Sequence, residues 1–316
     1  MKRPTITDIA KEAGVSKGAV SYALNGRPGV SEATRRRITE IARELGWAPS
    51  STARALSGGR SGALGLVLDR PPEVFVPALL DGFEGELLVQ VAAGRDAALA
   101  VYRRWRAERK VDGVLLTTPG CAAELVRIGL PAVVLGGPGG VPGVPSVLVD
   151  DVTGAAEALA YLAALGHRHV VRIAGAAVFA DPAARRRAFT TAATGLPYPG
   201  TVHPEPSADA VRRVLAARPR PTALLCDTDD LAVAALAAAR ELGLAVPKDL
   251  SVVSWDDTPL CRLVRPALTA IRRPLAELGA LAASVLHDVL AGERPGDVYA
   301  SRPRLITRGS TGPANG

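Results

Sequence analysis

Residues 13–26 read AGVSKGAVSYALNG, and this stretch decides how the first part of the chain folds. Gly14 follows a helical pattern of apolar residues, and glycine takes the left-handed conformation that ends a helix at little cost. Ser16 then offers a side chain that caps a second helix, which we expect over residues 17–24. Two short helices joined by a glycine-containing turn are typical of a helix-turn-helix unit.

The flanking segments complete a domain of three helices. Thr5 or Thr7 is placed to cap a first helix, with Asp8 in its first turn. Ser31 begins a third helix, with Glu32 in its first turn. The apolar stripe of that helix is expected to face the other two and consists of Ile38, Ile41, Ala42 and Leu45. We therefore expect a helix-turn-helix domain over residues 1–49.

Basic residues are concentrated in this first part. Residues 1–60 hold eleven Lys and Arg against five acidic residues, a net charge of +6, whereas the whole chain of 316 residues carries +7. The other 256 residues therefore carry only +1. A compact basic head on a nearly neutral body is typical of a protein that binds a polyanion such as nucleic acid. A basic surface that only improves solubility is the alternative.

The second helix carries small and polar side chains that suit the major groove of DNA, which is about 12 Å wide. Lys17 is suited to donate to guanine, and the Ala19 methyl to contact thymine where it faces outward. Ser16 and Ser21 are placed to donate to phosphates. Gly18 costs about 1 kcal/mol of helix stability, so it either allows a close backbone approach or is a weak position. The expected DNA contacts of this segment are Ser16, Lys17, Gly18, Ala19, Ser21 and Tyr22.

Residues 5–56 resemble the DNA-binding head of the LacI/GalR family of bacterial transcription regulators. The resemblance is carried by Thr5, Asp8, Ala10, Ala13, Gly14, Val15, Ser16, Val20, Ser21, Asn25, Val30, Ser31, Thr34, Arg35, Ile38, Leu45, Pro49, Ala53 and Leu56. It implies further DNA contacts through Thr5, Asn25, Ser31 and Thr34. The family usually has a threonine where this chain has Ala19, which replaces a hydroxyl contact by a methyl contact.

The segment SSTARALSG, residues 50–58, is too short to form a stable helix alone. The resemblance implies a hinge over residues 50–60 that orders on the operator, with Ala53 and Leu56 contacting DNA. Two such hinge helices pair in the minor groove, where Leu56 would wedge a base step and kink the duplex. The alternative is that Leu56 packs on the body as part of a linker.

After residue 60, short apolar strands alternate with helical segments. We expect strands at 63–69, 111–118, 131–137, 146–151, 169–175, 222–230 and 250–257, and helices at 153–165, 208–217 and 231–242. This alternation predicts an α/β fold with parallel sheets covered on both faces. The strands are too many for one compact sheet, so we expect two doubly wound lobes with a ligand cleft between the carboxyl ends of their strands.

The body resembles the effector-binding part of the same family over residues 61–311, in blocks such as RPTALLCDTDDLAVAAL and VPKDLSVVSWDD. This implies the two-lobed fold of periplasmic sugar-binding proteins over 61–316, which also dimerises. We place the first lobe at 61–149 and 275–297, and the second at 150–274 and 298–316.

The resemblance also suggests an effector site. Arg185 matches the arginine that grips the effector, and Asp229 matches an aspartate of the cleft. Asp256 follows an apolar strand, and Asp69 and Phe75 follow the first strand as weaker candidates. A guanidinium and a carboxylate in one cleft fix sugar hydroxyls or a ligand carboxylate. The alternatives are a surface arginine at 185, a helix cap at 229 and a structural role at 256.

Two departures weaken the expectation of a sugar. The family normally has several more residues between GFEGEL and LVQVAAG, and the stretch 189–211 is also short. The position where many members stack an aromatic ring on a sugar falls near Val202. The pocket therefore holds a sugar, a different ligand or none.

Other functional classes lack their motifs. There is no Gly-x-Ser-x-Gly elbow, P-loop or His-Glu-x-x-His, so we expect no enzyme and no cofactor. His167 and His169 are more typical of a turn before a strand than of a metal site. The three cysteines, Cys121, Cys226 and Cys261, are too far apart for a zinc cluster or a disulfide framework. Without an export signal or a membrane-spanning segment, we expect a cytoplasmic protein.

The sequence thus predicts a sequence-specific transcriptional regulator, interpreted as a repressor, that binds double-stranded DNA at a pseudo-palindromic operator. We expect a homodimer, with a tetramer left open, and a small-molecule effector in the cleft, a sugar among the candidates. A solute-binding protein of the periplasmic type and a regulator that has lost effector control are the alternatives.

Overall fold

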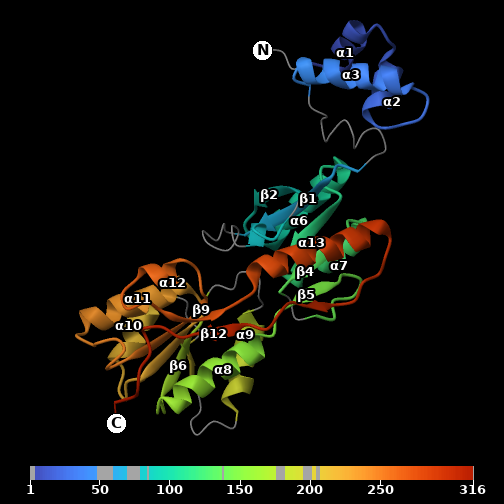
Figure 1. Ribbon diagram of the computed structural model, residues 1–316. Helices are drawn as coiled ribbons and strands as arrows, with labels where there is room; N and C mark the ends of the chain where they lie inside the picture. The colour runs from blue at the N-terminus through green and yellow to red at the C-terminus, as the bar shows by residue number, and fades with distance from the viewer. Residues whose placement is uncertain are drawn as a thin grey trace. The chain divides into compact units, whose positions relative to one another are not determined.

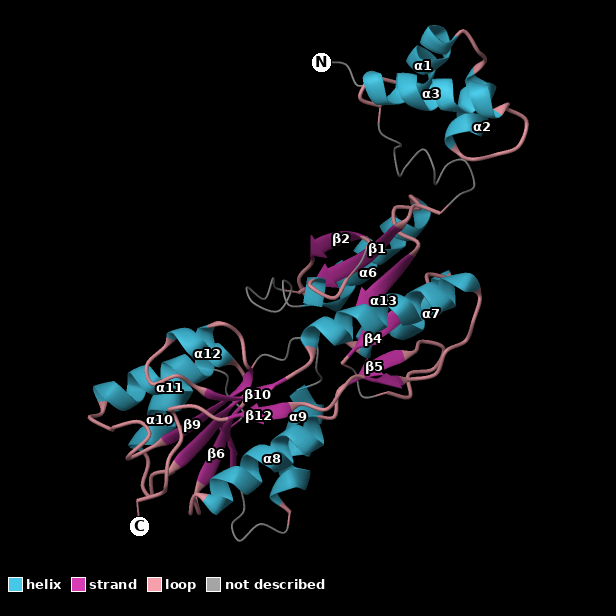
Figure 2. Ribbon diagram, in the orientation of Figure 1, coloured by secondary structure: helices cyan, strands magenta, loops and turns pink. Residues whose placement is uncertain are grey.

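The computed structural model describes residues 4–47, 60–69, 79–83, 85–136, 139–175, 182–194, 201–203 and 207–315, without the side chains of 182–184 and 201–203. The chain divides into two compact units, Met1–Ser61 and Gly62–Gly316, called here the head and the body. Figures 1 and 2 show the elements of each unit. The expected hinge contacts Ala53 and Leu56, and the effector candidate Phe75, lie outside the described residues.

The head consists of three helices, α1 (Ile6–Ala13), α2 (Lys17–Leu24) and α3 (Glu32–Glu44). The Thr5 amide donates to the Asp8 carboxylate at 2.8 Å, so Thr5 rather than Thr7 precedes α1. Gly14 has φ 65°, the left-handed conformation that ends α1. The Ser16 and Ser31 hydroxyls accept from the amides of Ala19 and Thr34 and cap the other two helices. The predicted helix-turn-helix is therefore confirmed.

The core of the head comes from one face of each helix. Ile9, Val20 and Ile38 have no exposed surface, and Ala10, Ala13, Ala23 and Ala42 are buried with them. Leu45, expected in this stripe, is 39% exposed because it lies just past the last turn of α3 as its C-cap. Such a small core leaves little stability to spare.

The body contains two sheets of six strands (Figure 2). The first is parallel throughout, in the order β11 (Val298–Tyr299), β5 (Ser146–Leu148), β4 (Ala132–Leu135), β3 (Gly113–Leu116), β1 (Ala63–Leu68) and β2 (Glu86–Val91). The second is parallel except for its first strand, in the order β12 (Arg304–Ile306), β10 (Thr269–Arg272), β9 (Ser251–Asp256), β8 (Ala223–Cys226), β6 (Val170–Ile173) and β7 (Thr201–His203). The expected pair of doubly wound parallel sheets is confirmed.

Helices cover both faces of each sheet. Around the first sheet lie α6 (Gly94–Ala107), the short helix η1 (Pro119–Cys121), α7 (Ala122–Ile128) and α13 (Leu275–Ala291). Around the second lie α8 (Asp151–Ala164), α9 (Pro182–Ala193), α10 (Ala208–Ala216), α11 (Asp229–Glu241) and α12 (Leu260–Leu263). Close packing explains Gly65 in β1, where a Cβ would lie 2.5 Å from the Trp105 ring of α6.

The chain crosses between the sheets three times, after β5, after β10 and after β11. Because β11 pairs with β5, the first sheet includes Val298 and Tyr299, which the expected boundary at 297 assigns to the second lobe. Leu87 and Leu88, between which the family has several more residues, both belong to β2, and this strand pairs with all six residues of β1. No helix in the described part of the chain is long and apolar enough to cross a membrane.

Candidate nucleic-acid interface and ligand site

The second helix of the head turns one side to solvent. Its inward side is formed by Val20 and Ala23, which are buried. Lys17 is exposed and makes no hydrogen bond or ion pair with the described residues, and Tyr22 is 45% exposed. The other expected contacts are exposed at Thr5, Ser16, Gly18, Asn25 and Ser31 and half-buried at Ala19, Ser21 and Thr34. Seven of the described contact residues lie on α2 or at its two caps, whereas Thr5 precedes α1 and Ser31 and Thr34 lie at the start of α3.

Several of these side chains also fix the helices. Ser16 and Ser31 accept hydrogen bonds from backbone amides at 3.1 and 3.3 Å. A hydroxyl that accepts through a lone pair keeps its own proton, so a capping serine can still donate to a phosphate. Asn25 donates to the Ser21 carbonyl at 2.9 Å and closes the end of α2. Helix capping and DNA contact are therefore compatible at these positions.

Arg35 of α3 holds the C-terminal end of α2. Its guanidinium donates to the carbonyls of Tyr22, Ala23 and Arg27 at 3.3, 2.8 and 2.8 Å. A cation at this end also interacts favourably with the helix dipole. Gly29, at φ 111°, lies against the Tyr22 ring, where a Cβ would stand 3.4 Å from it. Sequence reasoning assigned neither residue a role, because Arg35 acts through contacts outside its own helix and Gly29 lies in the loop between α2 and α3.

The body has a buried charged cluster at the carboxyl ends of β6, β8 and β9. Arg185 of α9 is 1% exposed. It donates to the Asp227 carbonyl at 2.6 Å and pairs with Asp256 at 3.2 Å, and it lies 5.1 Å from the centre of the Trp255 ring. Burial disfavours the charge on Arg185, but the carboxylates of Asp256, Asp151 and Asp227 outweigh it and raise its pKa. Arg185 is therefore not the surface arginine of the alternative interpretation.

The neighbouring carboxylates are held within the fold. Asp256 also pairs with Arg273 at 3.1 Å. Arg172 and Asp227, both almost fully buried, form a two-pronged ion pair with an Nε–Oδ1 distance of 2.7 Å. These pairs keep the buried charges neutralised by one another, as burial requires.

Asp229 is 6% exposed, and both of its oxygens accept hydrogen bonds, from the Ser254 hydroxyl and from the Thr258 amide. The helix cap proposed as its alternative role is provided by Thr228, which accepts from the Leu231 amide. Asp229 therefore ties the start of α11 to the end of β9.

Four buried polar atoms of this cluster have no hydrogen-bond partner among the described residues. They are Arg185 Nε, Trp255 Nε1, Asp256 Oδ2 and Thr258 Oγ1. Buried polar groups are nearly always paired with protein or water, so such a group of free atoms is typical of a site for water or a polar ligand. Beside it, a cavity of about 290 Å³ is lined by Asp256 and Arg273 together with Asp81 and Glu277 of the first lobe. Sequence reasoning missed Asp81 and Glu277, which follow no strand.

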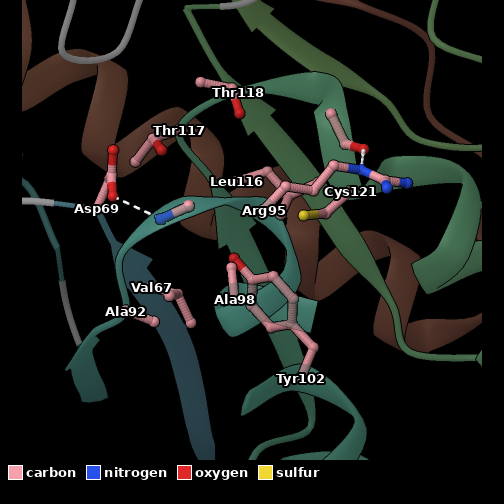
Figure 3. Close-up of a pocket in the computed structure, with 12 residues that line it drawn as sticks. Val67, Asp69, Ala92, Arg95, Ala98, Tyr102, Leu116, Thr117, Thr118 and Cys121 are labelled. Carbon is pink, nitrogen blue, oxygen red and sulfur yellow. Dashed lines mark hydrogen bonds between the residues drawn. The ribbon is translucent and has the colours of Figure 1, made fainter. Parts of the chain in front are cut away.

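Asp69 lies in a different pocket, of about 180 Å³, whose lining comes from the first lobe alone (Figure 3). One Asp69 oxygen accepts from the Gly94 amide at 2.7 Å, at the start of α6. The hydroxyl of Tyr102, a residue only 2% exposed, points among the lining side chains without a hydrogen-bond partner in the described chain (Figure 3). Burial raises the pKa of Tyr102, so this hydroxyl stays protonated. The structure therefore does not bring Asp69 together with Arg185, Asp229 and Asp256.

Two family models match the chain. Residues 5–50 match the model described as bacterial regulatory proteins, lacI family, and residues 159–311 match a periplasmic binding protein-like domain. The transcriptional repressor PurR of Pectobacterium atrosepticum is 30% identical over 328 residues, which cover 97% of this chain and 96% of that protein. The chain belongs to the lacI family of bacterial regulatory proteins.

Other lacI-family proteins agree in sequence and fold. Catabolite control protein A of Priestia megaterium is 28% identical over 96% of this chain and 97% of its own length. A lac repressor dimer bound to operator and an anti-inducer superposes with a TM-score of 0.83 at 25% identity, covering 98% of this chain and 100% of its own. A family regulator from Mycobacterium smegmatis gives 0.69 at 29% identity, covering 80% of this chain and all of its own.

These comparisons establish the function at the level of the family. The protein is a DNA-binding transcriptional regulator, and its relatives are regulators and not enzymes, as the sequence predicted. The match of the lacI model to residues 5–50 favours this function over that of a free solute-binding protein.

Proposed function

We propose that the protein is a repressor that binds a pseudo-palindromic operator as a homodimer and responds to a small molecule bound by its body. The observation that carries the proposal is the outward face of α2, with Lys17 and Tyr22 exposed on a basic three-helix head. Relatives named as repressors support the direction of regulation. Two heads related by a two-fold axis would read two inverted half-sites.

Within this proposal, Lys17 and Tyr22 read bases, with Gly18 and Ala19 at the groove. Polar side chains beside them contact phosphates: Thr5, Ser16, Ser21, Asn25, Ser31 and Thr34. Ala53 and Leu56 contact the minor groove from a hinge over residues 50–60, between a DNA-binding domain at 1–49 and the body at 61–316.

A homodimer is supported by apolar side chains on the edge of the first sheet. Leu88, Val89 and Val91 of β2 are 36, 41 and 52% exposed. Exposed apolar side chains on an edge strand are suited to contact with a second copy of the chain.

The effector site is proposed at the charged cluster, with Arg185 and Asp256 at its centre and Asp229 fixing its geometry. The four free polar atoms support a ligand there. Asp69 lies in a separate pocket of the first lobe and is not part of this site. Phe75, by resemblance, contributes from the first lobe. Binding would change the operator affinity through a coupling of about 1–3 kcal/mol.

One observation favours a regulator without effector control. Arg185 is buried and already paired with Asp256, so its charge is satisfied without a ligand. A metabolite screen distinguishes the two possibilities, because the second predicts that no compound alters DNA binding.

The experiment that tests the proposal is selection of bound duplexes from a random pool with the full chain. We expect an enriched motif with two inverted half-sites and a complex of two chains per duplex by light scattering. The selected duplex is then used to screen metabolites for release of the protein. Enrichment of a motif without inverted symmetry would contradict the dimeric operator, and unchanged DNA binding with every metabolite would contradict control by an effector.

A further inference from the structure

The function described so far does not use the most basic stretch of the body. Residues 103–110 read RRWRAERK, with five basic residues and one acidic residue in eight. All of them except Trp105 are exposed. Runs of this composition are typical of surfaces that bind nucleic acid or other polyanions, although a solvated surface is the commoner reason for a charged stretch.

The position of this stretch distinguishes it from an ordinary charged surface. It forms the last turns of α6 and the turn that leads into β3. The Asp112 amide donates to the Ala63 carbonyl at 2.9 Å, and the Gly62 amide donates to the Asp112 carboxylate at 2.8 Å. The stretch therefore lies beside the first residues of the body, near the N-terminal end of β1, which follows the segment from the head (Figure 1).

The end of α7 extends the same surface. Arg106 donates to the Ile128 carbonyl at 3.2 Å, and Glu124 bonds both Arg103 and Arg127. We call this surface the basic edge, which consists of Arg103, Arg104, Arg106, Arg109, Lys110 and Arg127.

The basic edge keeps a positive charge after its acidic neighbours are counted. Glu108 pairs with Lys110 at 2.6 Å, and Asp112 accepts from Gly62. Hydrogen bonds from Arg127 and Arg103 lower the pKa of Glu124 to about 2, so it is ionised at neutral pH. Six basic and three acidic side chains leave +3, whereas the rest of the body, Gly62–Gly316, carries −2. The basic edge thus carries a net positive charge, whereas the rest of the body is slightly acidic.

We propose that the basic edge contacts phosphates of the duplex held by the head and adds affinity without adding sequence preference. Duplex DNA is the polyanion that fits, because the head tethers it to this end of the chain at a high effective concentration. Guanidinium groups match phosphate oxygens in pairs, and phosphate contacts carry no sequence information. The proposal takes from the preceding section only that the head binds DNA.

The test compares two triple variants of the full chain on a long random-sequence duplex, by fluorescence anisotropy between about 50 and 200 mM salt. The first is Arg104→Gln/Arg109→Gln/Lys110→Gln. The control, Arg168→Gln/Arg240→Gln/Arg262→Gln, removes the same charge from exposed positions elsewhere on the body. Each phosphate contact contributes about 0.9 to the slope of log affinity against log salt. With three contacts removed per chain, we expect the first variant to lower the slope by about 2.7, so that its affinity falls about fortyfold less than that of the wild type over this fourfold range of salt.

Three further measurements complete the design. Arg104→Lys/Arg109→Lys/Lys110→Arg keeps the charge and should keep the wild-type slope. A short duplex of about two helical turns, just enough for two half-sites, should give a smaller difference in slope between the wild type and the first variant, because it lacks flanking phosphates. The motif enriched by the first triple variant should match that of the wild type.

Equal slopes for the first variant and the wild type would overturn the proposal. An equally lowered slope in the control variant would also overturn it, because that result would indicate only long-range attraction between the body and the DNA. A wild-type chain that binds no duplex would overturn the DNA-binding function itself. Thermal unfolding of each variant establishes that it is folded, and the charge-conserving variant separates lost charge from lost packing.

Discussion

Replacing Arg35 with alanine should loosen the recognition helix of the head. The Arg35 guanidinium joins α3 to three carbonyls at and beyond the end of α2, those of Tyr22, Ala23 and Arg27. Arg36, the next residue, is exposed and forms no hydrogen bond or ion pair with the described residues. Arg36→Ala therefore removes the same charge without the bridge and serves as the matched control.

The magnitude follows from the bonds that are lost. A hydrogen bond to a charged group contributes about 1.5–3 kcal/mol where it is shielded from water. The Arg35 side chain is 22% exposed, and water replaces part of what the carbonyls lose. The C-terminal dipole of α2 adds about 0.3–1 kcal/mol. We therefore expect Arg35→Ala to destabilise the head by about 2 kcal/mol, and Arg36→Ala by much less.

Hydrogen exchange measured by mass spectrometry provides the assay. A loss of about 2 kcal/mol lowers the protection of the buried head amides about thirtyfold where they exchange by unfolding of the head. Peptides from the body act as an internal reference and should not change. Operator affinity should fall further for Arg35→Ala than for Arg36→Ala. Equal protection of the head in the two variants would refute the role of Arg35 as a bridge.

Four further outcomes are expected. Lys17→Ala should cost about 1–3 kcal/mol on the selected operator and relax the preference at one base pair of each half-site, measured by repeating the selection. Leu56→Ala should weaken operator binding and reduce the bend seen in circular-permutation gels; an unchanged bend would contradict a wedge. Val89→Asp/Val91→Asp should shift the chain to a monomer in light scattering, because charge replaces apolar surface on the edge strand. Burial lowers the pKa of His167 in the folded protein below its unfolded value of about 6.5. The neutral imidazole therefore stabilises the fold above about pH 6.5, and this stability is lost as the pH falls through the folded pKa. His167→Asn should flatten the dependence of the unfolding free energy on pH in this range, and an unchanged dependence would show that His167 is not its cause.

The head could be predicted closely because its signals are local. Each helix is bounded by a residue whose effect depends on its immediate neighbours, as with Gly14 and the caps Ser16 and Ser31. Seven strands of the body were also visible, because buried parallel strands form continuous apolar runs. The expected strands did not include β2, β7, β10, β11 and β12. Leu45 was misplaced because helical periodicity gives no end point for a helix.

The proposed ligand site was less visible because its contacts join distant parts of the chain. Asp229 was identified as a cleft residue, but its partners Ser254 and Thr258 lie on another strand and the turn after it. Tyr102 belongs to a helical apolar stripe, which predicts a core residue and gives no sign of a free hydroxyl in a pocket. The return of the chain to the first sheet at β11 rests on two residues, too few for a recognisable pattern.

The pairing of Arg185 with Asp256 limits what the proposed effector can be. Removing one partner of a buried ion pair costs about 3–5 kcal/mol, so a ligand that displaced Asp256 from Arg185 would have to offset that cost before it gained affinity. A ligand that leaves the pair intact has no such cost, and it finds two donors, Arg185 Nε and Trp255 Nε1, an acceptor at Asp256 Oδ2, and the Thr258 hydroxyl. These four polar groups match an uncharged molecule with both donors and acceptors better than a carboxylate or a phosphate. Asp256 would repel an anion bound within hydrogen-bonding distance of its free oxygen.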